Sequence, residues 1–390
     1  MGLFASKESY LGVDIGTASI KIVELSSLNG RPRLMTYGYA DIVTDIVHSK
    51  SEENQIKIVN SLKNVVAKSR VGTNLAIAAL PTFSVFNSII TLPAMSDKDL
   101  ALAIKWEAKK YVPLPLEEMI LDWKIIKENN GTVKSPLEPI KPLKKKGFPL
   151  FNFKKNGSAK ASDKLPDSLA KPAVKGENVR VLVTAAPKNL VSRYMSIFRQ
   201  AGLKLISLET EAFALSRSLI GSDPGTIMIV DIGSITTDIC IIEKGVPVLN
   251  RSIDLGGLSI SKAIAQSLNI SLERAEQFKR DFGVSLSADN QPQGINKNIA
   301  ASLSPIINEI KYVFDLYQGQ ASRPVEKIVL SGGSAFLPNL SGYFEDLFAK
   351  PTIIGNPWDK VVYDAGLKAV LDEVGSRMAV AIGLAMRDIK

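Results

Sequence analysis

Aspartate, glycine and hydroxyl side chains recur in the same order in two segments of this 390-residue chain, at 13–25 and 230–242. Each segment consists of an apolar run, a short turn that carries Asp, Gly and Ser or Thr, and a second apolar run. Asp231 follows Asp14 by 217 positions, and the two segments align at this offset without a gap. A gapless repeat indicates that one strand–turn–strand unit occurs twice in the molecule.

A turn of this composition can bind phosphate. Glycine lets the turn adopt conformations that other residues avoid and lets the backbone approach a ligand, while successive N–H groups can form an anion-binding nest. Because Asp14 and Asp231 would repel a bare phosphate, we expect them to hold a hydrated Mg²⁺ that bridges phosphate oxygens. The alternative for either copy alone is an ordinary β-hairpin with a glycine turn. The repetition favours two facing hairpins that bind one polyphosphate.

Composition excludes several classes of site. One cysteine, Cys240, and one histidine, His48, cannot make an intrachain disulfide, a cysteine-type zinc site or a multi-histidine metal centre. The sequence has no Gly-x-x-x-x-Gly-Lys-Ser/Thr loop, so it is not a P-loop ATPase. No apolar run approaches the ~18 residues of a membrane span, and no basic, apolar leader precedes the first strand. We therefore expect a cytoplasmic protein.

The net charge of +9 is concentrated in one segment. Residues 127–177 contain twelve lysines, five acidic residues and six prolines, which gives this segment a net charge of +7. Such a composition is typical of a flexible, solvated insert. Since the rest of the chain is nearly neutral, we expect no nucleic-acid partner. A basic tether to anionic lipid or to nucleic acid is the alternative for the insert.

Hydrophobic spacing predicts a mixed α/β chain. Helices are predicted at 53–69, 97–111, 189–201, 209–219, 258–268, 302–318, 339–348 and 376–387, with a further helix after Ser271 that contains 275–279. Strands are predicted within 11–25 and 227–242, and at 32–42, 74–80, 85–92, 119–126, 179–185, 203–208 and 328–330. Ser96 and Ser271 are predicted N-caps. Two halves that each begin with a strand–turn–strand unit and end in helices indicate two lobes with a ligand cleft between them.

The two hairpins, a later Gly332-Gly333 turn and a closing helix rich in small residues resemble, in this order, the actin, Hsp70 and sugar-kinase superfamily. The resemblance covers nearly the whole chain outside the lysine-rich insert. Within the branch that contains cell-division FtsA, the segments at 91–95, 105–113, 121–123 and 381–387 look more like the family of the type IV pilus assembly protein PilM. The resemblance implies a two-lobed, actin-like ATPase fold with an FtsA-type extra subdomain.

This resemblance also implies a division of the chain into domains. The first lobe would comprise 1–84 and 204–225, with the extra partner-binding subdomain at 85–203. The second lobe would comprise 226–375, including a helical subdomain at 251–320, and the closing helix at 376–390 would return to the first lobe. The lysine-rich insert interrupts the extra subdomain between two strands, where long loops are tolerated.

ATP and Mg²⁺ are the cofactors that the resemblance implies. The phosphate-binding positions would be Asp14, Gly16, Thr17 and Lys21 in the first hairpin, and Asp231, Gly233, Ser234 and Thr236 in the second. The adenosine side would be formed by Gly332, Gly333 and Ser334, with Glu276 and Lys279 near the ribose or adenine, and with Gly256 and Gly257 lining the same cleft. The alternative for Glu276 and Lys279 is an exposed ion pair on a helix.

The function implied is an ATP-binding scaffold of type IV pilus assembly. The extra subdomain would form, with the first lobe, a groove for the cytoplasmic N-terminal tail of PilN, and copies would associate into a ring peripheral to the inner membrane. Strong hydrolysis is not required. Glu209 or Glu211 could orient a water molecule, and a solvated helix start is the alternative for both. The other functions considered are an FtsA-like division filament protein and a small-molecule kinase.

Overall fold

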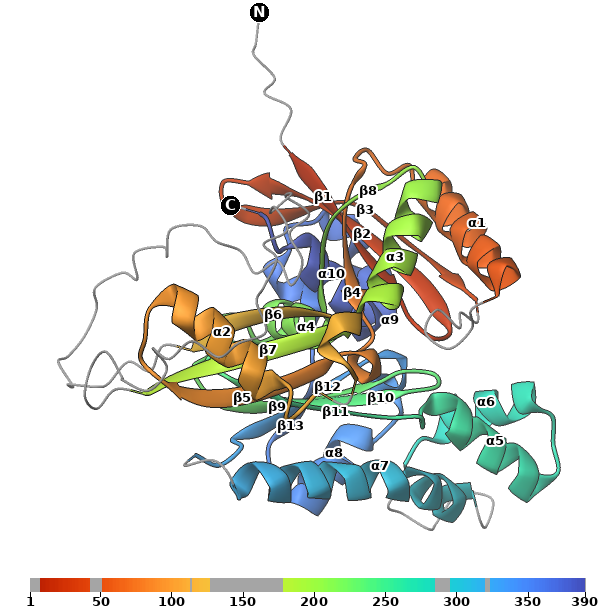
Figure 1. Cartoon of the computed structure of the whole chain (residues 1–390). Helices are drawn as coiled ribbons and strands as arrows, with labels where there is room; N and C mark the ends of the chain where they lie inside the picture. The colour runs from red at the N-terminus through yellow and green to blue at the C-terminus, as the bar shows by residue number, and fades with distance from the viewer. Residues whose placement is uncertain are drawn as a thin grey trace, which may run out of the picture.

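The structure is a computed structural model that describes residues 8–42, 51–112, 114–126, 178–284, 295–319 and 323–389. The predicted insert at 127–177 and His48 lie outside the described residues. The described chain contains three β-sheets with helices packed on them (Figure 1). No helix in these ranges is both long enough and apolar enough to cross a bilayer.

The first sheet has the strand order β3-β2-β1-β4-β8. Its strands are β1 (Ser9–Ile15), β2 (Ser19–Leu28), β3 (Arg31–Asp41), β4 (Leu75–Leu80) and β8 (Lys204–Thr210). The first three form an antiparallel meander, and β4 is parallel to β1. Helices α1 (Glu52–Lys68) and α3 (Lys188–Gln200) cover one face, where their apolar side chains join the strands in one core.

The second sheet repeats this arrangement with the order β11-β10-β9-β12-β13. Its strands are β9 (Thr226–Ile232), β10 (Thr237–Glu243), β11 (Val246–Ile253), β12 (Lys327–Ser331) and β13 (Thr352–Ile354). Strand β12 is parallel to β9, as β4 is to β1. Figure 1 shows α7 (Ile295–Gln318) and α8 (Leu340–Phe348) on one face, with α5 (Gly257–Leu268) and α6 (Leu272–Phe282) beside α7. The duplication seen in the sequence therefore extends to the sheets.

The third sheet is antiparallel and has the order β5-β7-β6. It consists of β5 (Phe86–Pro93), β6 (Met119–Ile126) and β7 (Asn178–Pro187), and α2 (Asp97–Ala108) packs on it through Leu100 and Ile104. All these elements fall within the segment predicted as an extra subdomain. The boundaries of the domains stay a prediction.

The closing helix α10 (Ala379–Ala385) lies between the first sheet and α4 (Glu211–Leu215). A Cβ placed on Gly12 of β1 would meet the carbonyl oxygen of Ala381 at 2.0 Å. A Cβ placed on Gly383 would meet the carbonyl oxygen of Ala214 at the same distance. Glycine is therefore required at both contacts, because α10 touches its two neighbours backbone to backbone.

Several elements differ from the sequence-based prediction. The helix predicted at 209–219 is split into α4 and a π-helical turn at Ser216–Ile220, and the closing helix begins with a 3-10 turn at Gly375–Met378. Strands β11 and β13 and helix α9 (Lys368–Val374) were not predicted. Further 3-10 turns occur at Thr82–Ser84, Leu116–Glu118, Gly333–Phe336, Pro357–Lys360 and Ala365–Leu367.

Candidate functional site

A cavity of about 1130 Å³ lies between the two duplicated sheets. It is lined by the turn residues of both hairpins, Asp14, Gly16, Thr17, Lys21, Asp231, Gly233, Ser234 and Thr236. The residues predicted for the adenosine side also line it, namely Gly257, Glu276, Lys279, Gly332, Gly333 and Ser334. The structure thus brings together side chains from segments more than 300 residues apart in one space of the size used for small ligands.

The two hairpin turns have the same backbone hydrogen bond. Gly16 N–H donates to the carbonyl of Ser19, and Gly233 N–H donates to the carbonyl of Thr236, each at 2.9 Å. Neither glycine has a positive φ, so neither turn uses the left-handed backbone conformation that glycine permits. The glycines instead leave the cavity wall without a side chain. A Cβ on Gly16 would lie 3.5 Å from Nζ of Lys21.

Helix α5 begins directly against the second hairpin. The N–H groups of Gly257 and Leu258 donate to the carbonyls of Gly233 and Ser234 at 2.9 and 2.8 Å. Gly256 does not line the cavity, but a Cβ at this position would lie 2.6 Å from the carbonyl oxygen of Gly233. Its role is to let the start of α5 approach the turn, which holds the turn in place.

Asp14 and Lys21 form an ion pair across the first hairpin. They face each other in the β1–β2 register, and Nζ of Lys21 lies 2.9 Å from a carboxylate oxygen of Asp14. Burial lowers the pKa of Lys21, and the charge and hydrogen bond of Asp14 raise it by more, so the pKa is raised overall. The ammonium is therefore held protonated at the cavity wall.

The corresponding pair in the second hairpin consists of two carboxylates, Asp231 and Asp238. Burial raises the pKa of Asp231 to about 6 and that of Asp238 to about 7, and the charge of Asp231 contributes to the shift at Asp238. Among the described residues, one buried oxygen of Asp238 has no hydrogen-bond partner. A buried carboxylate with an unpaired oxygen, opposite a half-buried one, favours a cation with oxygen ligands, which fits Mg²⁺.

Glu211 lies at the start of α4 and lines the same cavity. Its carboxylate accepts hydrogen bonds from the backbone N–H and the hydroxyl of Thr82, at 3.0 and 2.8 Å. Burial raises the pKa of Glu211 well above its ordinary value, and the charges of Asp238 and Asp14 raise it further. Glu211, one of the two acids predicted to orient a water molecule, therefore lines the same cavity as the two hairpin turns and is not a solvated helix start.

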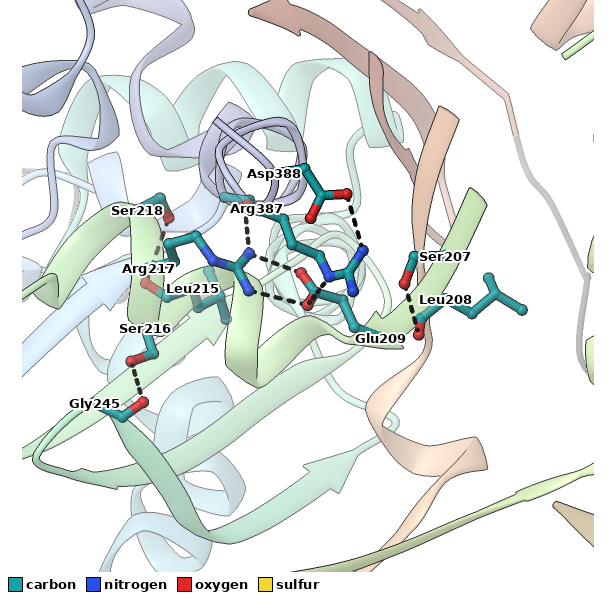
Figure 2. A network of polar contacts seen from close by, with 11 residues as sticks. Ser207, Leu208, Glu209, Leu215, Ser216, Arg217, Ser218, Gly245, Arg387 and Asp388 are labelled. Carbon is teal, nitrogen blue, oxygen red and sulfur yellow. Dashed lines mark hydrogen bonds and ion pairs between the residues drawn. The ribbon is translucent and has the colours of Figure 1, made fainter. Parts of the chain in front are cut away.

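Glu209, the other candidate, lies outside the cavity. Figure 2 shows its carboxylate between the side chains of Arg217 and Arg387. Its fully buried carboxylate receives two hydrogen bonds from Arg217, at 2.8 and 3.0 Å, and lies 3.7 Å from Nε of Arg387. These arginines tie β8 to the π-helical turn and to the end of α10. Glu209 is therefore a structural anion, which removes it from the catalytic candidates and also excludes a solvated helix start.

Glu276 and Lys279 connect α5 with α6 at the other end of the cavity. Nζ of Lys279 donates to the carbonyl of Gly257 and to Oγ of Ser261, both at 3.0 Å, and to Glu276 at 2.6 Å. An ammonium has three N–H donors, so these bonds occupy all of them. The pair is not the exposed helical ion pair that was the alternative, because Lys279 is buried. Glu276 also pairs with Arg280 at 3.1 Å, and both residues line the cavity.

The glycine turn after β12 packs on the end of β9. Gly332 has a φ of +83°, and a Cβ there would lie 2.4 Å from the carbonyl oxygen of Ile232. Only glycine fits both conditions. Ser334 donates to the carbonyl of Gly233 at 3.4 Å, which brings this turn against the second hairpin.

Sequence reasoning missed several charged residues of the cavity, among them Asp238 and Arg377. The repeat carries a signal for Asp238, because it follows Lys21 by the same 217 positions that separate the two hairpin aspartates. The sequence carries no such signal for Arg377, which comes from the 3-10 turn before α10 and pairs with Asp41 of β3 at 3.1 Å.

A family model described as "Type IV pilus assembly protein PilM" matches residues 12–136 and 167–389. This chain belongs to the PilM family. The membership confirms the resemblance drawn from the sequence, and the match extends over both hairpins, the third sheet and α10.

Solved structures confirm the two-lobed, actin-like fold of this PilM-family chain. A structure titled "PilM-PilN type IV pilus biogenesis complex" superposes with a TM-score of 0.75 at 24% identity and covers 98% of both chains. MreB5 of Spiroplasma citri bound to AMPPNP superposes with a TM-score of 0.50 at 14% identity, over 96% of this chain and 94% of that one.

Curated relatives match the PilM-family chain only in part. The cell division protein FtsA of Neisseria meningitidis serogroup B is 26% identical over 233 residues, which are 53% of this chain and 54% of FtsA. The ethanolamine utilization protein EutJ of Escherichia coli K12 is 28% identical over 155 residues, or 40% of this chain and 49% of EutJ. The chain thus spans about half the length of the curated relatives it matches.

Proposed function

We propose that this PilM-family chain is an ATP-binding scaffold in type IV pilus assembly. The observation that carries the proposal is the single cavity lined by both hairpin turns and by the Gly332-Gly333 turn. In this proposal the two hairpins bind the triphosphate from opposite sides, and the glycine turn packs against the adenosine. The structural neighbour MreB5, which was solved with AMPPNP, supports a nucleotide in this fold.

Asp14 and Asp231 would hold Mg²⁺ through water molecules. No group of three or more His, Cys, Asp or Glu side chains suited to direct metal ligation occurs in the part of the chain that the structure describes. Bound Mg²⁺ supplies positive charge to the phosphate oxygens. Lys21 supplies a second positive charge from the first hairpin, and the turn N–H groups and the hydroxyls of Thr17, Ser234 and Thr236 donate hydrogen bonds to the phosphates.

Hydrolysis would be weak at most. Glu211 is the acid best placed to orient a water molecule, but burial raises its pKa well above the ordinary value. A raised pKa favours the protonated carboxyl group, and only the carboxylate can accept a proton from the attacking water. In our proposal the nucleotide therefore sets the relative arrangement of the two lobes and so biases partner binding.

The proposed partner is the cytoplasmic N-terminal tail of PilN. The solved complex of PilM with PilN covers 98% of this chain, which supports a common partner. We place the tail in a groove between the part of the chain that contains β5, β6 and β7 and the first sheet. The proposal also includes self-association into a ring and a peripheral position at the inner membrane.

The nucleotide part is tested by calorimetric titration of ATP into the wild type, Asp14→Ala and Asp231→Ala. We expect both variants to lose most of the affinity, and unchanged affinity in both would overturn the site. Glu211→Gln should lower any ATP turnover. Glu209→Gln serves as its matched control, because that glutamate lies outside the cavity; its turnover is compared under conditions where it is folded.

The partner part is tested by titrating a peptide that corresponds to the PilN tail into nucleotide-free and ATP-saturated protein. We expect binding whose affinity changes with ATP. A second candidate, an FtsA-like filament protein, has the support of the match to FtsA over about half of each chain. Filaments that form with ATP, together with no affinity for the peptide, would favour that candidate.

A further inference from the structure

Arg377 occupies a position from which it reaches both lobes. It precedes α10, and its side chain lies over the glycine turn of the second lobe, with Cγ 3.5 Å from where a Cβ of Gly333 would be. Its guanidinium lies 3.1 Å from Asp41 and 5.0 Å from the ring centre of Tyr39, both on β3 of the first sheet. Arg377 therefore spans the cavity between the two sheets.

Arg377 lines the same cavity as the turn residues of both hairpins. Arg377 and Lys21 are two of the cations on the cavity wall. The other two cations of the wall, Lys279 and Arg280, are bonded to Glu276 at the adenosine end.

The ion pair between Arg377 and Asp41 can be broken at a small cost in free energy. The Asp41 side chain is 71% exposed, and that of Arg377 is 34% exposed. An ion pair at this exposure contributes little, because water solvates both charges well. A phosphate chain in the cavity carries more negative charge than one carboxylate and is matched by the planar donor fork of an arginine.

We propose that Arg377 is a phosphate-binding residue that exchanges Asp41 for the phosphate chain of the nucleotide. The inference rests on the proposed ATP site and adds a ligand residue and a partner exchange to it. Because Asp41 and Tyr39 belong to β3 and Gly333 to the second lobe, the exchange transmits the presence of phosphate to the edge of the first sheet.

The test compares the affinities of ATP, ADP and adenosine for the wild type, Arg377→Ala and Arg251→Ala. Arg251 is a matched control, because it pairs with Glu309 at 2.8 Å and lies 5.2 Å from the ring of Tyr312, away from the cavity. Loss of a charged hydrogen bond predicts about tenfold or more weaker binding of ATP and ADP to Arg377→Ala. Adenosine affinity should change by less than about twofold in both variants, as should the ATP affinity of Arg251→Ala.

Asp41→Asn tests the exchange itself. Removing the competing carboxylate should tighten ATP binding about two- to fivefold in the wild-type background, and this gain should vanish in the Arg377→Ala background. A gain that persists without Arg377 would show general charge repulsion and contradict the exchange.

The outcomes are separable. Equal losses for ATP and adenosine in folded Arg377→Ala would indicate a structural role, and an unchanged ATP affinity would remove Arg377 from the site. Either result overturns this inference while the nucleotide site stands. A wild type that binds no ATP would overturn the proposed function and this inference with it.

Discussion

The two hairpins share a backbone and differ in charge. Each has Asp at the end of its first strand and the same 2.9 Å bond from glycine N–H to a carbonyl three residues later. The residue opposite the aspartate is Lys21 in the first hairpin and Asp238 in the second. The first aspartate is therefore neutralised within its own hairpin, whereas the second faces a second carboxylate, that of the buried Asp238.

In our proposal this difference gives the two hairpins separate contributions. Both aspartates hold Mg²⁺ through water, and the first hairpin adds the positive charge of Lys21, whereas the second supplies positive charge to the phosphates only through that cation. The duplicated unit would thus provide the two halves of a phosphate clamp, which differ at the position opposite the aspartate. The following variants test whether the halves differ in this way.

Lys21→Met should have the largest effect. It leaves Asp14, whose side chain is only 6% exposed, without its cation. Breaking one partner of a buried pair typically costs about 3–5 kcal/mol, and we expect an unfolding free energy lower by about this amount, together with loss of most ATP affinity. Chemical denaturation and calorimetry measure the two effects.

Lys57→Met is the matched control for this substitution, because Lys57 pairs with Glu53 at 2.7 Å on the exposed face of α1. Its unfolding midpoint should stay within the error of the wild-type value. If Lys21→Met lost no more stability than this control, the buried pair would have no role in the first hairpin.

Substitutions at glycines of the two turns should differ in their effect on stability, by less than Lys21→Met differs from its control. A Cβ on Gly256 would meet backbone atoms of Gly233 and Ser234 at 2.6–2.7 Å, so Gly256→Ala must push α5 away from the second turn. Overpacking of this kind costs about 1–3 kcal/mol. Gly16→Ala meets only atoms at 3.4 Å or beyond and should leave stability unchanged. Equal destabilisation of both variants in urea would contradict the asymmetry.

Asp238→Asn should change the pH dependence of stability. Asp238 and Asp231 have pKa values of about 7 and about 6 in the folded protein, against 3.8 ordinarily. The folded state therefore binds protons that the unfolded state has released, and the unfolding free energy falls as pH rises from about 4 through 7. The variant should be on the order of 1–2 kcal/mol more stable than the wild type at pH 8 and similar to it at pH 4.

Urea unfolding of both proteins at several pH values measures this effect. In the second hairpin the stabilising protonation is present at low pH and is lost as pH rises. An unfolding free energy of the wild type that increases between pH 5 and 8 in the absence of nucleotide would show that the pKa values of the two carboxylates are not raised in the folded protein.

Local sequence signals predicted most of the fold. Ser96 and Ser271 cap α2 and α6 as predicted, because their hydroxyls accept hydrogen bonds from N–H groups three residues later in the chain. The α-helix predicted at 209–219 extends past the end of α4. Nothing local in the sequence marks the change to a π-helical turn at Ser216–Ile220. Strand β11 was missed; it carries Pro247, and its pairing with β10 includes a register shift.

The candidate site was predictable where it repeats and unpredictable where distant residues meet. The hairpin aspartates and glycines were found because each copy supports the other. Glu209 was misassigned because its neutralising partners, Arg217 and Arg387, reach it only in the folded chain. Arg377 was missed for the same reason, since its partner Asp41 lies 336 residues away in the sequence.

The division of tasks between the hairpins is tested most directly by titrating ATP, with Mg²⁺ and with a chelator, into the wild type and Asp231→Asn. The account predicts that Mg²⁺ strengthens ATP binding to the wild type by about tenfold or more, or 1.4 kcal/mol, and that Asp231→Asn loses most of this gain. A gain of the same size in both proteins would contradict the account.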